Sequence, residues 1–147
     1  MNLLRLTSII CIGLLLSCNS SKGIDQSKEL IKVLNDYFDG IKKNDLVKMK
    51  QNTTVDYQLF ESGKIWNNDS LFNDLQRFKD TKIEFRLDNF KVLINENIGH
   101  IAYFNHGEIY KKDTLVRTIN WIENAVFKKD NDQWKIYFLQ STLNANN

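Results

Sequence analysis

Hydrophobic positions follow a helical period in much of the segment 27–78 and a strand period from Lys82 onward. Apolar side chains recur three and four residues apart between Leu30 and Ile41, which predicts an amphipathic helix with Ser27 as its N-cap. Asn44 is placed to cap a short second helix. A third helix is predicted to open at Asn68, with apolar positions at Leu71, Phe72, Leu75 and Phe78.

From Lys82 onward the apolar positions alternate with a period of two, which predicts long strands joined by short turns. The alternation slips at Asp88 and Asn89, and such a slip predicts a β-bulge that bends the strand. The predicted strands are 54–60, 65–66, 82–94, 98–110, 114–128 and 133–142. Helices followed by hairpin-linked strands predict an α+β fold, a cone-shaped curved antiparallel sheet with N-terminal helices packed in its concave face.

The N-terminus reads as a targeting signal. One basic residue, Arg5, precedes an apolar run of eleven residues, Leu6–Leu16. This run is too short to span a hydrocarbon core of about 30 Å, but it suits a secretory signal peptide. The sequence Leu-Leu-Ser-Cys that ends at Cys18 resembles a bacterial lipobox, whose cysteine is diacylated and becomes the mature N-terminus. An uncleaved anchor and an ordinary signal peptide are the alternatives.

Lipidation at Cys18 divides the chain into a lipoprotein signal peptide at 1–17, a lipidated tether at 18–25, one folded domain at 26–143 and a polar tail at 144–147. It also predicts the location. We expect a bacterial lipoprotein held at a membrane outside the cytoplasm, at the outer membrane, on either the periplasmic or the surface leaflet. The mature domain would then contain no free thiol and no disulfide.

Composition excludes several classes of function. The 147 residues include 20 Lys and Arg against 18 Asp and Glu, so the net charge of +2 gives no basic footprint for nucleic acid. His100 and His106 fall on one strand face without a third ligand, so no metal site is predicted. Ser141 has no histidine at a catalytic spacing, and no glycine-rich phosphate loop is present. No cofactor is expected.

The stretch 98–142 carries several short motifs: Ile101-Ala102-Tyr103, Ala125-Val126-Phe127-Lys128-Lys129-Asp130, Trp134-Lys135-Ile136 and Gln140-Ser141-Thr142. It resembles the association domain of calcium/calmodulin-dependent protein kinase II and its bacterial relatives, within the nuclear transport factor 2-like superfamily of ketosteroid isomerases and polyketide cyclases. The resemblance covers 26–143 and implies a pocket between the helices and the concave sheet face.

The family's pocket residues carry over only in part. Three pocket arginines of the kinase association domain fall on Asn105, Ala125 and Ser141, so an anionic ligand held by arginines is not expected.

The comparison with ketosteroid isomerase implies a hydrogen-bond donor at Tyr37 and an acid near Glu123. The position of that enzyme's base falls on Tyr57, and Asp56 lies on the opposite face of the strand. The central catalytic base is therefore missing or displaced, which argues against isomerase chemistry.

The candidate acid or base is Glu123. If Trp121, Glu123 and Ala125 face the concave side, a carboxyl group enters the cavity beside an indole, where burial raises its pKa. In the opposite phase Glu123 is solvated. Whether Gln140 or Ser141 faces inward is likewise open. The predicted pocket-lining residues are Tyr37, Tyr57, Tyr103, Asn105, Trp121, Glu123 and Ser141, and the tyrosines and Trp121 fit equally well as core packing.

Three functions fit these patterns. The first is a lipid-anchored domain whose pocket binds a small, largely uncharged ligand. The second is a cofactor-independent isomerase, dehydratase or hydrolase with Glu123 as acid or base and Tyr37 or Tyr57 as hydrogen-bond donor. The third is a homodimeric interaction protein that pairs through the outer sheet face, where an apolar patch is predicted at Phe104, Ile122, Val126 and Phe138.

Overall fold

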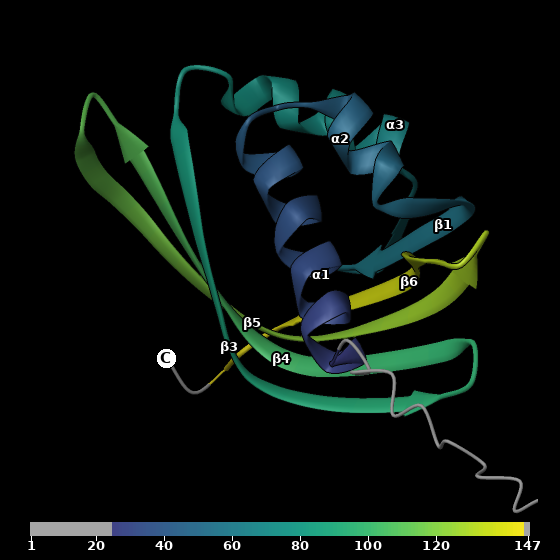
Figure 1. Ribbon diagram of the computed structural model, residues 1–147. Coiled ribbons are helices and arrows are strands. Elements are labelled where there is room, and N and C mark those ends of the chain that lie inside the picture. Colours follow the sequence, from purple (N-terminus) through teal and green to yellow (C-terminus); the bar gives the residue numbers. More distant parts are fainter. Residues whose placement is uncertain (1–24, 146–147) are drawn as a thin grey trace, which may run out of the picture.

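A curved six-stranded sheet wraps around the first helix in the computed structural model, which describes residues 25–145 (Figure 1). The predicted fold class is confirmed, and each predicted strand ends within two residues of the observed one. The elements in chain order are α1 (Gln26–Lys42), α2 (Leu46–Gln51), β1 (Thr53–Glu61), β2 (Lys64–Trp66), α3 (Asn68–Leu75), the 3-10 helix η1 (Gln76–Phe78), β3 (Lys82–Asn95), β4 (Ile98–Lys111), β5 (Thr114–Asp130) and β6 (Gln133–Leu143).

Helix α1 is amphipathic as predicted, but the predicted caps of both first helices are wrong by one or two residues. Asp25 caps α1 and accepts a hydrogen bond from the backbone N–H of Ser27. Asp45 caps α2, and Asn44 instead takes a left-handed backbone conformation in the link before it, with φ of 54°. In both cases a carboxylate occupies the cap, where its charge also complements the positive helix end. The buried stripe of α1 includes Leu30, Leu34, Tyr37 and Phe38.

Helices α2 and α3 lie near the C-terminal end of α1, at the wider end of the cone (Figure 1). Asn67 and Ser70 start α3 with a reciprocal capping box, in which each side chain accepts a hydrogen bond from the other residue's backbone N–H. This fixes the direction in which α3 leaves the β1–β2 hairpin. The inner side of α3 thereby becomes one wall of the space beneath the sheet.

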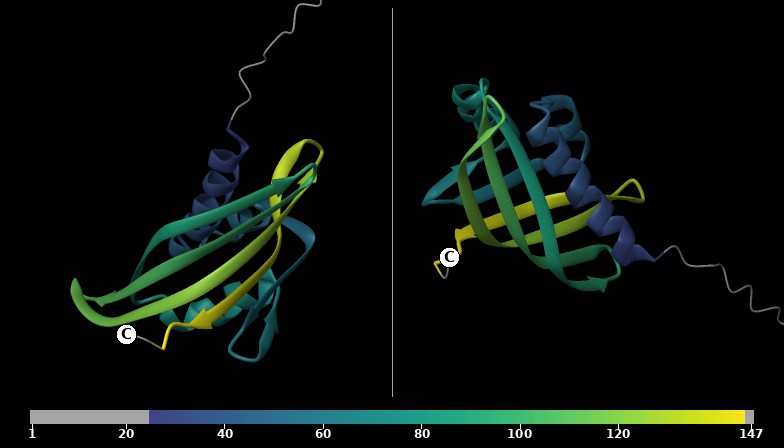
Figure 2. Two further views of the ribbon diagram at one scale, coloured as in Figure 1. Left: turned by 90° about the horizontal axis from the view of Figure 1, so that it is seen from below. Right: turned by 90° about the vertical axis from the view of Figure 1, so that its left-hand side faces the viewer.

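The strands are arranged in the order β2-β1-β6-β5-β4-β3. Neighbours are antiparallel except β1 and β6, which pair in parallel (Figure 2). The predicted bulge is confirmed, because the register of β3 against β4 shifts between Asp88 and Lys91 and Asn89 has a φ of 55°. A second shift, between Val126 and Phe127, bends the long β5–β6 pair. These irregularities curve the sheet around α1.

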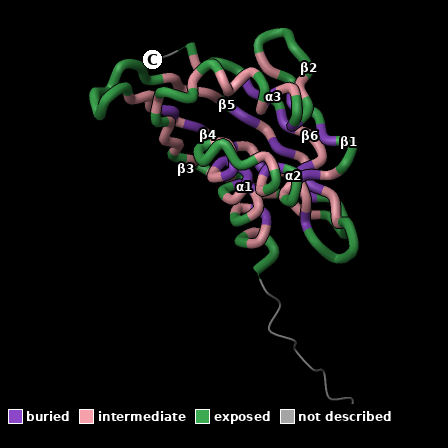
Figure 3. The backbone as a smooth tube through the Cα atoms, turned by 90° about the horizontal axis from the view of Figure 1, so that it is seen from above, coloured by how far each residue is buried: buried purple, intermediate pink, exposed green. Residues whose placement is uncertain are grey.

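The core lies between α1 and the concave sheet face, where the buried segments of the strands meet the helix (Figure 3). Gly99 lets the helix approach closely, because a Cβ there would lie 2.3 Å from Cδ2 of Leu30. The sheet contributes fully or almost fully buried side chains to this layer, among them Ile101, Ala125, Phe127, Ile136 and Leu139. The core fills the narrow end of the cone and leaves space toward α3.

The convex face carries the apolar residues expected there, interrupted by polar pairs. Ile122 is 44% exposed, whereas Phe104, Val126 and Phe138 are half-buried. Two histidine–asparagine hydrogen bonds cross this face, His100 to Asn124 at 3.2 Å and His106 to Asn120 at 2.6 Å. Homodimerisation through this face stays a prediction.

The signal peptide, Cys18 and most of the tether lie outside the described residues. Within residues 25–145, no helix is both long and apolar enough to cross a membrane. The same described segment contains no group of three His, Cys, Asp or Glu side chains placed to hold a metal ion.

Candidate functional site

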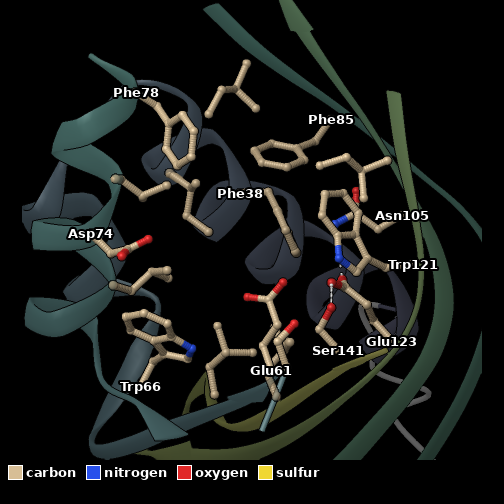
Figure 4. Close-up of a pocket in the computed structure, with 18 of the residues that line it drawn as sticks. Phe38, Glu61, Trp66, Asp74, Phe78, Phe85, Asn105, Trp121, Glu123 and Ser141 are labelled. Atoms are coloured by element: carbon tan, nitrogen blue, oxygen red, sulfur yellow. Dashed lines mark hydrogen bonds between the residues drawn. The ribbon is translucent and has the colours of Figure 1, made fainter. Parts of the chain in front are cut away.

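A cavity of about 310 Å³ opens between α1, α3 and the concave face of the sheet (Figure 4). Its volume lies at the lower end of the range usual for small-molecule sites. Most of its wall is apolar, and six aromatic side chains dominate it: Tyr37, Phe38, Trp66, Phe78, Phe85 and Trp121. The cavity is therefore suited to a small molecule with an apolar body.

Glu123 lies in the wall of this cavity and is only 3% exposed. Alternation along β5 turns Trp121, Glu123 and Ala125 to the concave side, which is the first of the two phases considered from the sequence. Ser141 lies directly beside Glu123 on β6, so Ser141 rather than Gln140 faces inward. The side chain of Glu123 is thus fixed by the register of three adjacent strands.

Both oxygens of the Glu123 carboxylate accept hydrogen bonds. The hydroxyl of Ser141 donates to Oε1 at 2.8 Å, and Nδ2 of Asn105 donates to Oε2 at 3.2 Å. Burial raises the pKa of Glu123 from 4.5 to about 7, although Tyr103, Ser141 and Asn105 each lower it in part. The charge of nearby Glu61 raises it further. Near neutral pH the group therefore exists in both protonation states, as a general acid or base requires.

Tyr37 and Tyr57 form a buried pair, with 2.8 Å between their hydroxyl oxygens. Burial raises the pKa of both phenols, so both are neutral at physiological pH. Tyr37 lines the cavity, but Tyr57 lies behind it and does not. Tyr57, which was predicted to line the pocket, is therefore not part of this cavity, because its hydroxyl is directed at Tyr37 in the core.

Tyr103 is also a core residue rather than a pocket residue, against the prediction. It is 2% exposed and its ring packs against Phe38 and Phe90. Tyr103 and Asn105 share the inward face of β4, but the rings beneath α1 cover Tyr103 and only Asn105 reaches the cavity. The Tyr103 hydroxyl influences Glu123, yet it makes no hydrogen bond of regular geometry with any residue between 25 and 145.

Two acidic residues that the sequence did not single out point into the same cavity, Glu61 and Asp74 (Figure 4). Burial raises the pKa of Glu61, partly offset by the indole N–H of Trp121. Glu61 ends β1 at the hairpin, where the sequence pattern suggested only a turn. Asp74 does carry a signal, because it lies three residues after Leu71 and four before Phe78 on the apolar stripe of α3.

Three basic residues, Lys64, Arg77 and Arg117, also border the cavity. Arg77 pairs with Asp74 at 2.7 Å, and its side chain is 63% exposed against 25% for Asp74. Lys64 lies over the ring of Trp66, 5.0 Å from its centre. None of the three matches the positions expected for family arginines, which hold Asn105, Ala125 and Ser141. The bases thus stand at the rim, outside the acids.

Comparison with known proteins identifies the fold of this chain but no relative by sequence. No protein-family model matches the sequence, and a search of curated proteins finds no match. Solved structures do match. A nuclear transport factor 2-like protein from Cytophaga hutchinsonii is similar with a TM-score of 0.70 and 10% identity, covering 82% of this chain and all of that one.

Two further structures agree. A calcium/calmodulin-dependent kinase II association domain-like protein from Exiguobacterium sibiricum has a TM-score of 0.70 at 11% identity, covering 84% of this chain and 96% of that one. A ketosteroid isomerase-like protein from Shewanella frigidimarina has a TM-score of 0.61 at 15% identity, covering 76% and 92%. The protein therefore has the nuclear transport factor 2-like cone fold.

Proposed function

We propose that this protein is a lipid-anchored domain outside the cytoplasm that binds a small, largely apolar molecule in the cavity of the cone. The observation that carries the proposal is the combination of aromatic walls with one buried, hydrogen-bonded carboxyl group, Glu123. Such a site buries an apolar body and orients it through a few polar contacts. The fold supports this proposal without specifying a ligand, because one fold hosts many unrelated functions.

Filling the cavity tests ligand binding. Ile119 lines the cavity from β5, and replacing it by Trp is expected to abolish the binding of any molecule that co-purifies with the protein. Native mass spectrometry of the detergent-extracted protein measures this directly. Ile122→Trp is the matched control, because Ile122 lies on the same strand and faces the convex side. A ligand that persists in the Ile119→Trp variant would place its site elsewhere.

The anchoring is tested at Cys18. Cys18→Ala is expected to leave an unprocessed precursor, because the thiol that accepts the diacyl group is gone. Metabolic labelling with a fatty acid and separation of membrane from soluble protein report the change. Cys11→Ala, in the apolar run, is the control and is expected to keep both label and location. Unaltered mobility and labelling of the Cys18→Ala protein would refute the lipid anchor.

A second candidate function is proton transfer on the bound molecule. It is favoured by the position of Glu123, which is buried in the cavity wall and hydrogen-bonded at both carboxylate oxygens. Burial raises the pKa of Glu123 to about 7, which suits a group that takes and returns a proton at neutral pH. Similarity to a ketosteroid isomerase-like structure supports the same class of chemistry. Glu123→Gln separates the candidates. An enzyme loses turnover while it still binds substrate, whereas a binding protein changes only in affinity.

A further inference from the structure

We infer that the ligand carries a protonated amine, and that its nitrogen lies deep in the cavity among Glu123, Asn105 and Glu61. This inference rests on the proposed binding function and names the chemical class of the ligand. Figure 4 shows the carboxylates of Glu61, Asp74 and Glu123 directed into one cavity from different elements. The amine would occupy the region between Glu61 and Glu123, across the cavity from Asp74, with the apolar body toward the aromatic wall.

Hydrogen-bond acceptors outnumber free donors at this end of the cavity. Nδ2 of Asn105 donates to Oε2 of Glu123, which is the orientation that ionised Glu123 requires, because a carboxylate oxygen accepts and does not donate. The amide Oδ1 of Asn105 is thereby left without a hydrogen-bond partner among residues 25–145, in a side chain that is 1% exposed. A buried acceptor without a partner costs free energy, which a ligand N–H group would recover.

The donors that line the cavity beside Glu123 are already committed, and the hydroxyl of Tyr103, unpartnered within the described part of the chain, lies in the core outside the cavity lining. The Ser141 hydroxyl donates to Glu123, and the hydroxyls of Tyr37 and Tyr57 bond to each other. The ligand therefore has to supply the N–H or O–H groups. An ammonium group offers up to three donors and no acceptor, which matches the two carboxylates and the amide oxygen better than a hydroxyl or a carbonyl group does.

The walls suit a cation as well as an apolar body. Aromatic ring faces attract a positive charge within about 6 Å of their centres, and the attraction grows when water is excluded. Phe38 and Trp121 line the cavity on the side of Glu123 (Figure 4). The indole N–H of Trp66, on β2, is a buried donor in this wall that has no hydrogen-bond partner among residues 25–145, and it fits an acceptor elsewhere on the ligand.

The arrangement of charged residues favours a cation over an anion in the interior of the cavity. The acids lie inward and the bases Lys64, Arg77 and Arg117 lie at the rim, with Arg77 already paired to Asp74. An anion would meet the rim bases but would then face Glu61 and Glu123 inside. A cation between Glu61 and Glu123 instead relieves the repulsion between the two carboxylates, each of which has a raised pKa.

Three probes with the same phenyl ring test the inference on the full-length protein in detergent: 2-phenylethylamine, 2-phenylethanol and phenylacetate. At pH 8 we expect the amine to bind about tenfold or more tighter than the alcohol, since hydrogen bonds to charged groups are the stronger ones. Isothermal titration in two buffers of different ionisation enthalpy should show proton release near pH 7, because the cation favours ionised Glu123.

Variants assign the effect to named groups. Glu123→Gln is expected to remove most of the preference for the amine while the affinity for the alcohol changes by a few fold at most. Glu96→Gln, in the exposed β3–β4 turn, changes the net charge equally and should keep the preference. Equal affinity for amine and alcohol, tighter binding of phenylacetate or no amine binding would overturn the inference. The proposed binding function is tested separately, by whether a co-purified molecule is lost in the Ile119→Trp variant.

Discussion

Replacing Glu123 by Gln is expected to raise the free energy of unfolding by about 3 kcal/mol at pH 8 and to leave it almost unchanged at pH 4. Folding raises the pKa of this carboxyl group from 4.5 to about 7, and each pKa unit corresponds to about 1.4 kcal/mol. Gln fits the site, because its amide oxygen can accept from Asn105 while its NH₂ donates to Ser141. The variant therefore removes a buried charge without losing the hydrogen bonds.

The sign follows from proton binding. Below pH 4.5 Glu123 is protonated in both the folded and the unfolded chain and costs nothing. As the pH rises from 4.5 to about 7, the unfolded chain loses the proton first, so the stability of the native protein falls, and the loss is complete above that range. Urea unfolding of both proteins from pH 4 to 9 measures the difference between their free energies of unfolding. The contributions of the other titrating groups are the same in both proteins and drop out of this difference.

Glu96→Gln is the control for net charge, since Glu96 lies in an exposed turn. Its unfolding curve should follow that of the native protein across the pH range. A constant difference between Glu123→Gln and the native protein from pH 4 to 9 would show that Glu123 keeps an ordinary pKa in the fold, and the acid–base role would lose its basis.

The sheet could be predicted from the sequence because its strands are local and their periods are distinct. The slip in the alternation at Asp88 and Asn89 was enough to predict the bulge, since a change of phase in a period-two pattern has few other causes. The parallel pairing of β1 with β6 had no such signal. It joins segments about eighty residues apart through backbone hydrogen bonds, and these leave no pattern in the side chains.

The residues of the candidate site also divide into those that the sequence could identify and those that only the fold reveals. Glu123 could be singled out because it lies near the acid implied by the resemblance and close to Trp121, but its facing could not be decided, because each register shift along a curved strand can reverse the phase. Glu61 was missed because its role depends on how the β1–β2 hairpin folds over the cavity. Tyr57 and Asn105 are both polar residues on inward strand faces, and only packing decides that one is covered and the other lines the space.

Gly107→Val is expected to lower the free energy of unfolding by about 2–3 kcal/mol and to block the cavity. Gly107 lies on β4 beside β5, and the indole of Trp121 rests on it. A Cβ at this position would lie 2.6 Å from Cζ3 and 3.0 Å from Cη2 of that ring. The ring is rigid and the sheet lies behind it, so the indole has to turn into the cavity. Overpacking of this kind typically costs about 1–3 kcal/mol.

The effect of Gly107→Val should reverse in a Trp121→Leu background. Without the indole the new side chain has room, and a strand glycine is conformationally unfavourable by about 0.5–1 kcal/mol, so the second substitution should stabilise the protein. Urea unfolding of the four proteins in this cycle gives the coupling, and binding of 2-phenylethanol reports the cavity. If Gly107→Val costs the same in both backgrounds, the indole does not depend on the glycine. The position of the indole in the cavity wall would then depend on contacts other than the one with Gly107.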